Sequence, residues 1–272
     1  MLLCDMHTHS NNSFDAKNSV DEMCRAAILR GVKVLAVTDH CEAPSIGLGA
    51  DCEFGCFDEL IPQSIYDARD ARLKYGGRLR VLTGLELGEP MHEPELTRRA
   101  LAYGEYDFVL ASVHNIRSYR DFYYMDYKTV DVAEVLRKYF DELIETAAFP
   151  HYDSLAHITY PLRYIKATFG KLPDLSPYSA QIDEVFKILI KNNKSLEINV
   201  SGLFKELGTT LPDVDLVKRY RELGGRLITI GTDAHSVEFV GKGLEQGIDV
   251  AKRAGFGEYA YYVKHEPIMV SF

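Results

Sequence analysis

Residues 2–10 read Leu2-Leu3-Cys4-Asp5-Met6-His7-Thr8-His9-Ser10, an apolar segment that ends in two histidines. In an extended strand alternate side chains share a face, so His7 and His9 point the same way, with Cβ atoms roughly 7 Å apart. That separation allows both imidazoles to bind one metal ion. Taken alone, the pair is equally compatible with two surface histidines at a strand end, so its interpretation depends on the rest of the chain.

Short β-rich segments alternate with longer amphipathic ones, which is typical of repeated βα units and a mostly parallel sheet. After the first strand, further strands are expected at residues 32–38, 79–86, 106–113, 154–156, 195–200, 226–231 and 259–264. Helices are expected at 19–30, 60–74, 93–103, 130–149, 179–192, 213–223 and 242–254. Residues 41–58 have no clear period and are expected to form a long loop. This pattern over 272 residues predicts one (β/α) barrel domain, residues 1–272, rather than a doubly wound open sheet.

Potential metal ligands cluster at the C-terminal ends of the expected strands and in the loop after the first one. They are His7, His9, Asp15, His40, Glu86, His114, His157, Asp233 and His235. Because active sites of such barrels lie at the C-terminal ends of the strands, these groups are expected to meet at one centre. Histidine and carboxylate together suit zinc, iron or manganese, and these ligands suffice for two or three ions that share a bridging carboxylate. Glu89 and His92 follow closely, but Glu86 better fits a strand end.

Composition restricts the partners of the chain. A formal charge of -9 and a pI near 5.5 argue against an extended nucleic-acid surface. No apolar run reaches the roughly 20 residues that span a bilayer, so no membrane partner is expected. The odd number of cysteines, without a secretory signal, predicts a reduced, cytoplasmic protein with free thiols at Cys4, Cys24, Cys41, Cys52 and Cys56. For Cys52 and Cys56 the alternative is half of a zinc site. The sequence leaves the oligomeric state open.

Six short motifs contain all the candidate ligands except Asp15: Met6-His7-Thr8-His9-Ser10, Thr38-Asp39-His40, Gly84-Leu85-Glu86, Ser112-Val113-His114, Leu155-Ala156-His157 and Gly231-Thr232-Asp233-Ala234-His235. In this order they resemble the successive motifs of the PHP family, named for polymerase and histidinol phosphatase. Residues 106–114 and 197–203 are similar to segments of its histidinol-phosphate phosphatase branch. The resemblance covers essentially the whole chain. It implies a distorted, TIM-like (β/α)7 barrel of the PHP type with a trinuclear metal centre.

The resemblance also implies how the ligands are shared. One metal would take His7, His9, Glu86 and Asp233; a second would share Glu86 and take His114 and His157; a third would take Asp15, His40 and His235. Many relatives have a histidine at the position of Asp15, where a carboxylate can serve the same purpose. Asp39 is expected to orient a ligand rather than to bind metal.

The implied activity is metal-dependent hydrolysis of a small phosphate monoester, L-histidinol phosphate, in histidine biosynthesis. A metal-activated hydroxide would attack phosphorus, with Asp233, His235 and Glu86 as the predicted catalytic residues. Arg163, Arg117 and Lys205 are the candidates for binding phosphate. Arg163 ranks first because a guanidinium can hold two phosphate oxygens, and a solvated surface charge is the alternative for each.

Other interpretations stay open at this point. The substrate could be another small phosphate ester, a nucleotide or a phosphodiester, and a non-catalytic metal-binding regulatory domain is an alternative of a different class. The tyrosine-rich run of residues 119–127 fits either an aromatic wall for a substrate ring or a packed loop. His151 and His265 are expected to be structural.

Overall fold

A parallel barrel forms the centre of the computed structural model, which describes residues 2–42 and 57–272. Its strands follow the order β1 (Leu3–Thr8), β2 (Val32–Val37), β4 (Arg80–Gly88), β5 (Phe108–Ser112), β6 (Ser154–Leu155), β7 (Ser195–Asn199) and β8 (Ile228–Gly231). Neighbouring strands pair in parallel, and β3 (His40–Glu42) adds to β4. Backbone bonds from Asp233 N to His7 O (2.8 Å) and from His9 N to Ala234 O (2.9 Å) join β8 to β1. The predicted distorted (β/α)7 barrel is confirmed.

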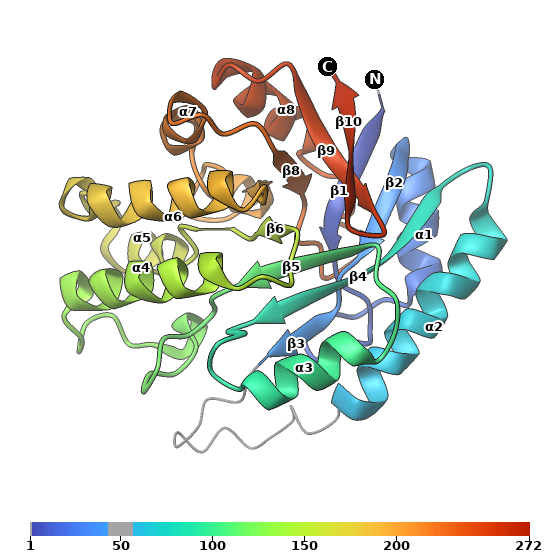
Figure 1. The fold of residues 1–272 in the computed structure, drawn as a ribbon, viewed down its shortest axis with the longest axis horizontal. Helices are drawn as coiled ribbons and strands as arrows, with labels where there is room; N and C mark the ends of the chain where they lie inside the picture. Colours follow the sequence, from blue (N-terminus) through green and yellow to red (C-terminus); the bar gives the residue numbers. More distant parts are fainter. Residues whose placement is uncertain (1, 43–56) are drawn as a thin grey trace.

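Helices surround this barrel (Figure 1). They are α1 (Val20–Leu29), α2 (Phe57–Tyr75), α3 (Pro94–Ala102), α4 (Val132–Ala148), α5 (Leu162–Phe169), α6 (Ser179–Lys191), α7 (Val214–Glu222) and α8 (Leu244–Arg253). A capping box begins α1, since Ser19 and Glu22 bond reciprocally. The sequence did not predict α5, because its eight residues are too few for a clear apolar period; Pro161 precedes it and the left-handed Gly170 ends it.

The strand expected at residues 32–38 is interrupted and then continues as β3. Thr38 N bonds Thr8 O at 2.8 Å, whereas Asp39 O accepts from Glu86 N at 3.1 Å, so the chain changes neighbour between these two residues. This change places His40 directly opposite Glu86 in the register of β3 and β4. Two predicted ligands therefore become neighbours through backbone pairing.

The last strand expected from the sequence lies outside the barrel. β9 (Glu258–Val263) pairs antiparallel with β10 (Glu266–Ser271) in a two-stranded sheet. This hairpin contacts the N-terminal ends of barrel strands: Tyr259 Oη donates to Leu2 O at 2.6 Å, Tyr262 Oη lies 2.8 Å from Ser195 Oγ, and His265 Nδ1 lies 2.9 Å from Asp153 Oδ2. It covers the end of the barrel opposite the candidate ligands.

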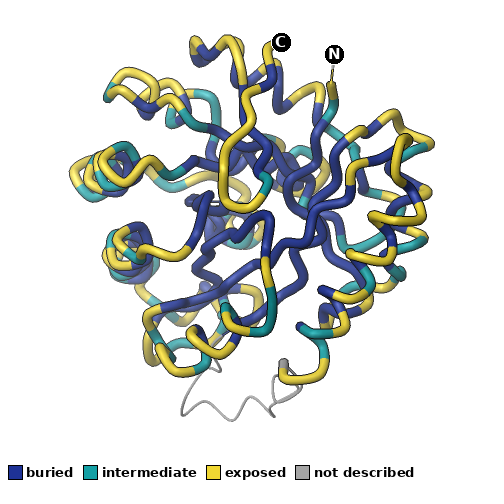
Figure 2. Tube along the Cα trace, turned by 45° about the vertical axis from the view of Figure 1, so that its right-hand side comes forward, coloured by how far each residue is buried: buried dark blue, intermediate teal, exposed yellow. Residues whose placement is uncertain are grey.

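Burial follows the same architecture (Figure 2), with the strands buried and the outer helix surfaces exposed. Cys4, Cys24 and Cys41 are buried free thiols, while Cys52 and Cys56 lie outside the described residues. Most of the loop expected at 41–58 also lies outside them, and its first residue, Cys41, belongs to β3. Within the described ranges, every helix is too short or too polar to cross a bilayer.

Candidate metal centre

The histidines of β1 face a carboxylate from β4 and another from the end of β8. His7 Nε2 lies 3.2 Å and His9 Nε2 3.4 Å from Glu86 Oε2. Asp233 Oδ1 lies 3.5 Å from His9 Nε2 and 3.9 Å from His7 Nε2. The structure therefore brings together the four residues predicted to hold the first metal.

The other oxygen of Glu86 faces a second pair of histidines. Glu86 Oε1 lies 3.0 Å from His157 Nε2 and 3.4 Å from His114 Nε2. The two ring nitrogens are 3.2 Å apart. Glu86 is fully buried and directs one oxygen to each group, which is the arrangement that a bridging carboxylate requires.

A third group lies at the rim. Asp15 Oδ2 is 3.2 Å from His235 Nε2, and Asp15 Oδ1 is 3.7 Å from His40 Nε2. The two histidine Nε2 atoms are 3.3 Å apart. Asp15 keeps 43% of its side-chain surface exposed, so this group is the most accessible of the three.

These donors fit divalent cations. Nine buried polar side-chain atoms of the described residues lack a hydrogen-bond partner, and three of them, His7 Nε2, His9 Nε2 and Glu86 Oε2, face one another in the first group. Unpaired buried polar atoms are costly and rare in native proteins, and a bound cation would satisfy several of these at once. Among the described residues, four sets of three potential ligands have donor atoms within 4.8 Å of one another: His9, His40 and His235; His7, His9 and Asp233; His7, Glu86 and His157; and His40, Glu42 and His114.

The electrostatics of the centre favour an ionised Glu86 with charged histidines beside it. Burial alone would lower the pKa of His7, His40 and His114, but neighbouring carboxylates raise it well above its usual value. Burial alone would raise the pKa of Glu86, but the neighbouring His7, His114 and His40 hold that pKa well below its usual range. Burial, together with the charges of His235 and His40, lowers the pKa of His9 well below its usual value. An ionised carboxylate and a neutral imidazole are the forms that coordinate metal.

Asp39 has the orienting role expected from the sequence. Its carboxylate accepts hydrogen bonds from Ser10 N (2.6 Å), Ser10 Oγ (2.8 Å), Ser13 Oγ (2.7 Å) and Ser64 Oγ (2.5 Å). Ser13 Oγ lies 3.2 Å from His9 Nδ1. Asp39 thus holds the loop after β1 and, through Ser13, the ring of His9.

Two buried carboxylates of the centre were not predicted. Glu42 Oε1 lies 2.9 Å from His114 Nδ1 and 3.0 Å from His40 Nδ1. Its signal in the sequence is the same alternation that pairs His7 with His9, since Glu42 follows His40 by two residues. Glu197 Oε1 lies 2.7 Å from His7 Nδ1. Its signal is an acidic residue inside a buried strand, where a charge requires a partner.

The three basic candidates have different surroundings. The Arg163 side chain is buried at the start of α5, with Nη2 3.7 Å from Asp233 Oδ2 and the guanidinium over the ring of Tyr160. Lys205 is exposed, and desolvation together with the charge of Arg163 lowers its pKa. Arg117 Nη1 instead bonds Glu142 at 2.8 Å and Glu145 at 2.9 Å. The structure does not bring Arg117 to the ligands.

The aromatic run divides into packed and exposed residues. Phe122 and Tyr127 are buried, whereas Tyr123 and Tyr124 are exposed. Outside this run, the ring of Tyr160 borders the ligands, with its centroid 5.0 Å from that of His114 and 5.2 Å from that of His157. Tyr160 was not predicted, because it lies beyond the short strand that presents His157.

Four further polar residues considered in the sequence, Glu89, His92, His151 and His265, lie outside the three ligand groups. Glu89 accepts hydrogen bonds from the backbone N–H groups of His114 and Asn115, and His92 pairs with Glu142 at 2.9 Å. His151 is exposed and contacts the ring of Phe149. His265 bonds Asp153, as described for the hairpin.

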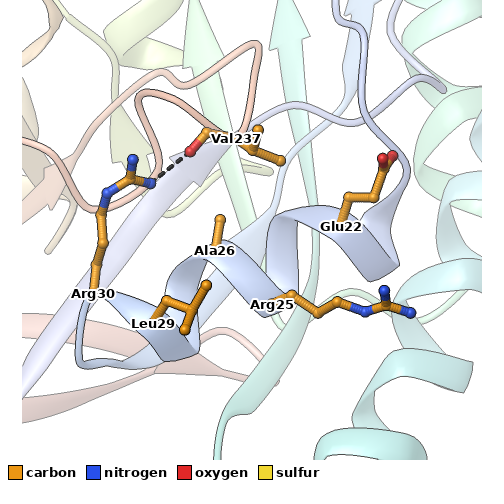
Figure 3. A pocket seen from close by; sticks show the side chains of 6 residues that line it. All are labelled: Glu22, Arg25, Ala26, Leu29, Arg30 and Val237. Atoms are coloured by element: carbon orange, nitrogen blue, oxygen red, sulfur yellow. Dashed lines mark hydrogen bonds between the residues drawn. The ribbon is translucent and has the colours of Figure 1, made fainter.

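A surface hollow beside α1 is separate from these ligands (Figure 3). Its lining residues are Glu22, Arg25, Ala26, Leu29, Arg30 and Val237. The Arg30 guanidinium donates to the carbonyls of Val237 (2.5 Å), Glu238 (2.9 Å) and Val240 (3.0 Å). These bonds tie the loop that follows His235 to the end of α1, which is a structural role.

Comparisons with known proteins agree with this geometry. The PHP domain family model matches residues 5–201. A probable histidinol-phosphatase of Thermotoga maritima is 30% identical over 255 residues, 93% of each chain, and the histidinol-phosphatase of Lactococcus lactis subsp. lactis is 26% identical over 272 residues, 96% of this chain and 95% of the relative. The crystal structure of histidinol phosphate phosphatase from Lactococcus lactis subsp. lactis, complexed with zinc, L-histidinol and phosphate, has a TM-score of 0.81 at 23% identity and covers 98% of both chains. The chain belongs to the PHP family.

Proposed function

We propose that this chain is a metal-dependent phosphomonoesterase that hydrolyses L-histidinol phosphate to L-histidinol and phosphate. The observation that carries the proposal is Glu86, whose two oxygens face two separate groups of histidines. The substrate is supported by full-length relatives named histidinol-phosphatase and by a structural neighbour that holds L-histidinol and phosphate. We place this activity in one PHP-type domain over residues 1–272.

The metal ligands follow from the three groups. The first ion would be held by His7, His9, Glu86 and Asp233, the second by Glu86, His114 and His157, and the third by Asp15, His40 and His235. Zinc, iron and manganese suit this donor set. When bound, such ions activate a water molecule and neutralise charge on the phosphoryl oxygens.

Residues beside the first group would act on the substrate directly. Arg163 is positioned to donate to phosphate oxygens, since its Nε is buried and lacks a hydrogen-bond partner among the described residues. Asp233 directs Oδ1 to the histidines, whereas Oδ2 faces Arg163 at 3.7 Å. This second oxygen can accept a proton beside the phosphate. His235, whose Nδ1 lies 3.0 Å from Asp233 O, is held next to it.

Aromatic rings offer a surface for the organic part of the substrate. Tyr160 packs against His114 and His157, and Phe14 stacks on His40 with 5.4 Å between ring centroids. An imidazole ring is flat and partly apolar, so it can pack against such groups. The buried thiols of Cys4, Cys24 and Cys41 support a reducing, cytoplasmic location.

Steady-state kinetics on a substrate panel tests the proposal. We expect kcat/KM for L-histidinol phosphate to exceed the values for a nucleoside monophosphate and a phosphodiester, with metal content measured on the same sample. A preference for another ester would contradict the substrate. Full metal loading without turnover of any ester would instead indicate a regulatory metal-binding domain.

A further inference from the structure

A row of polar side chains leaves β7 and continues into the following turn. Glu197 and Asn199 alternate along β7 and so share one face, and Ser201 begins the 3₁₀ helix Ser201–Phe204 that follows. Glu197 and Asn199 are fully buried and Ser201 is 8% exposed. Buried polar groups are costly unless each is paired, so the partners of this row indicate its purpose.

Hydrogen bonds join the row end to end. Arg163 Nη2 donates to Ser201 Oγ at 3.0 Å, and Ser201 Oγ donates to Asn199 Oδ1 at 2.6 Å. Asn199 Nδ2 donates to Glu197 Oε2 at 3.2 Å, while Glu197 Oε1 accepts from His7 Nδ1 at 2.7 Å. The row therefore connects Arg163, the proposed phosphate-binding residue, to His7, a proposed metal ligand.

The amide of Asn199 can take only one orientation in this row. Its Oδ1 accepts from the Ser201 backbone N–H at 3.0 Å as well as from the Ser201 hydroxyl, and its Nδ2 faces a carboxylate. A flipped amide would place oxygen against carboxylate and N–H against N–H. The hydroxyl of Ser201 has one proton, and Asn199 Oδ1 is closer to it than Asp233 Oδ2 at 3.4 Å. Every donor thus points toward Glu197.

We propose that Glu197, Asn199 and Ser201 are positioning residues that hold His7 and Arg163 in fixed orientation relative to each other. Glu197 keeps the proton of His7 on Nδ1, so that Nε2 remains available as a ligand. Ser201 holds one Nη of Arg163 and leaves Nε free to meet a phosphate oxygen. The part that concerns substrate rests on the proposed function, whereas the part that concerns zinc and phosphate binding does not.

Two single substitutions break the row without changing side-chain size. In Glu197→Gln the new amide has one oxygen and one N–H₂, so it cannot accept from both His7 and Asn199. In Asn199→Asp a carboxylate faces the carboxylate of Glu197. We expect each to weaken zinc binding by roughly 10- to 100-fold, the range for loss of an outer partner of a metal-bound histidine.

The double variant Glu197→Gln with Asn199→Asp restores every hydrogen bond of the row. Only the bond between positions 197 and 199 changes direction, with position 197 now the donor. The amide at position 197 can donate to the carboxylate at 199 while its oxygen accepts from His7, and Ser201 still donates to position 199. We expect the double variant to recover most of the zinc affinity that either single change loses. If each substitution were an independent structural defect, the two losses of zinc-binding free energy would instead add in the double variant.

Ser201→Ala separates the two ends of the row. It removes the contact to Arg163 but leaves Glu197 bonded to His7. We therefore expect weaker binding of inorganic phosphate to the zinc-loaded chain, by roughly tenfold for one lost charge-assisted bond, with zinc affinity unchanged. The control is Ser154→Ala, which removes a buried hydroxyl bonded to Thr229 Oγ1 at 2.8 Å elsewhere in the barrel.

Zinc titration and phosphate calorimetry, with thermal unfolding of each metal-stripped variant, measure these effects. If the variants of Glu197, Asn199 and Ser201 bind zinc and phosphate as well as Ser154→Ala does, the positioning role is overturned. It is also overturned if the double variant loses as much zinc-binding free energy as the two single variants together. If the wild type fails to hydrolyse L-histidinol phosphate but the variants lose affinity as stated, only the proposed function fails. If the wild type hydrolyses L-histidinol phosphate but the variants keep wild-type zinc and phosphate affinities, only the positioning role is contradicted.

Discussion

Gly231 on β8 packs directly against His7 on β1. A Cβ atom at Gly231 would collide with the Cβ of His7 and lie 2.6 Å from Glu197 Oε1. Neither neighbour can move freely, because His7 belongs to the barrel wall and its ring is bonded to Glu197. The absence of a side chain at Gly231 is therefore a condition for the position of a proposed metal ligand.

Gly231→Ala tests this packing. We expect a loss of roughly 1–3 kcal/mol in the free energy of unfolding, as for other overpacked sites, together with weaker zinc binding. Gly257→Ala is the matched control, because no described heavy atom lies within 4 Å of the Cβ it would add. Denaturant unfolding and zinc titration of both variants measure the effects. Equal behaviour of the two variants would contradict the close approach.

His9→Ala and Glu86→Ala each remove a buried ligand of the proposed centre. We expect turnover to fall below detection and zinc affinity to fall by at least about a hundredfold, more than for an outer partner. Glu86→Ala affects two groups and should lower the bound metal further. His151→Ala, at an exposed position, should retain both metal and activity. Loss of metal from the His151 variant would mean that the ligand of this segment has been assigned wrongly.

Arg163→Met and Arg117→Met compare a buried arginine with a half-exposed one, both of them candidates for binding phosphate. For Arg163→Met we expect a decrease in kcat/KM of roughly 10- to 100-fold, because charge-assisted hydrogen bonds to phosphate are lost. Arg117→Met removes ion pairs with Glu142 and Glu145 and should leave kcat/KM within about twofold. Kinetics with L-histidinol phosphate measure both, and the opposite ranking would contradict the placement of Arg163.

The hairpin should contribute a pH-dependent part of stability through His265. The hydrogen bond to Asp153 raises the pKa of His265 above 6.5 in the folded chain. A raised pKa of a base stabilises the fold below its unfolded pKa, and this contribution disappears as pH rises through the folded pKa. Because His265 is 51% exposed, the effect should stay below about 1 kcal/mol.

Denaturant unfolding of the wild type and His265→Gln at about pH 5.5 and about pH 9 measures the contribution of His265. The difference in the free energy of unfolding between the two proteins should be larger at the lower pH. A difference that is constant, or that grows with pH, would argue against the ion pair.

The strand-end ligands could be predicted because two simple rules apply to them. Alternation in a strand places His7 and His9 on one face, and parallel strands in a barrel bring their C-terminal ends together. The register that places His40 opposite Glu86 depends in addition on the change of neighbour between Thr38 and Asp39. The alternation of strand and helix segments predicted a (β/α) barrel, and the resemblance to the PHP family implied its distorted (β/α)7 form.

The errors arise where these rules do not apply. β3 is only three residues long and follows a break at Thr38 and Asp39, so the alternation that would have identified Glu42 is not visible as a period. Arg117 was a candidate for binding phosphate, but its direction is set by Glu142 on α4, 25 residues further along the chain. Long-range contacts of this kind leave no local pattern in the sequence.

The central claim is that a metal cluster held by His7, His9, Glu86 and their neighbours hydrolyses L-histidinol phosphate. Its most direct test is phosphate release from this substrate by the metal-stripped chain as zinc or manganese is added back, with bound metal counted at each step. We predict no release without metal and an increase that saturates when two or three ions are bound per chain. Release that is independent of metal, or none when the sites are filled, would contradict the claim.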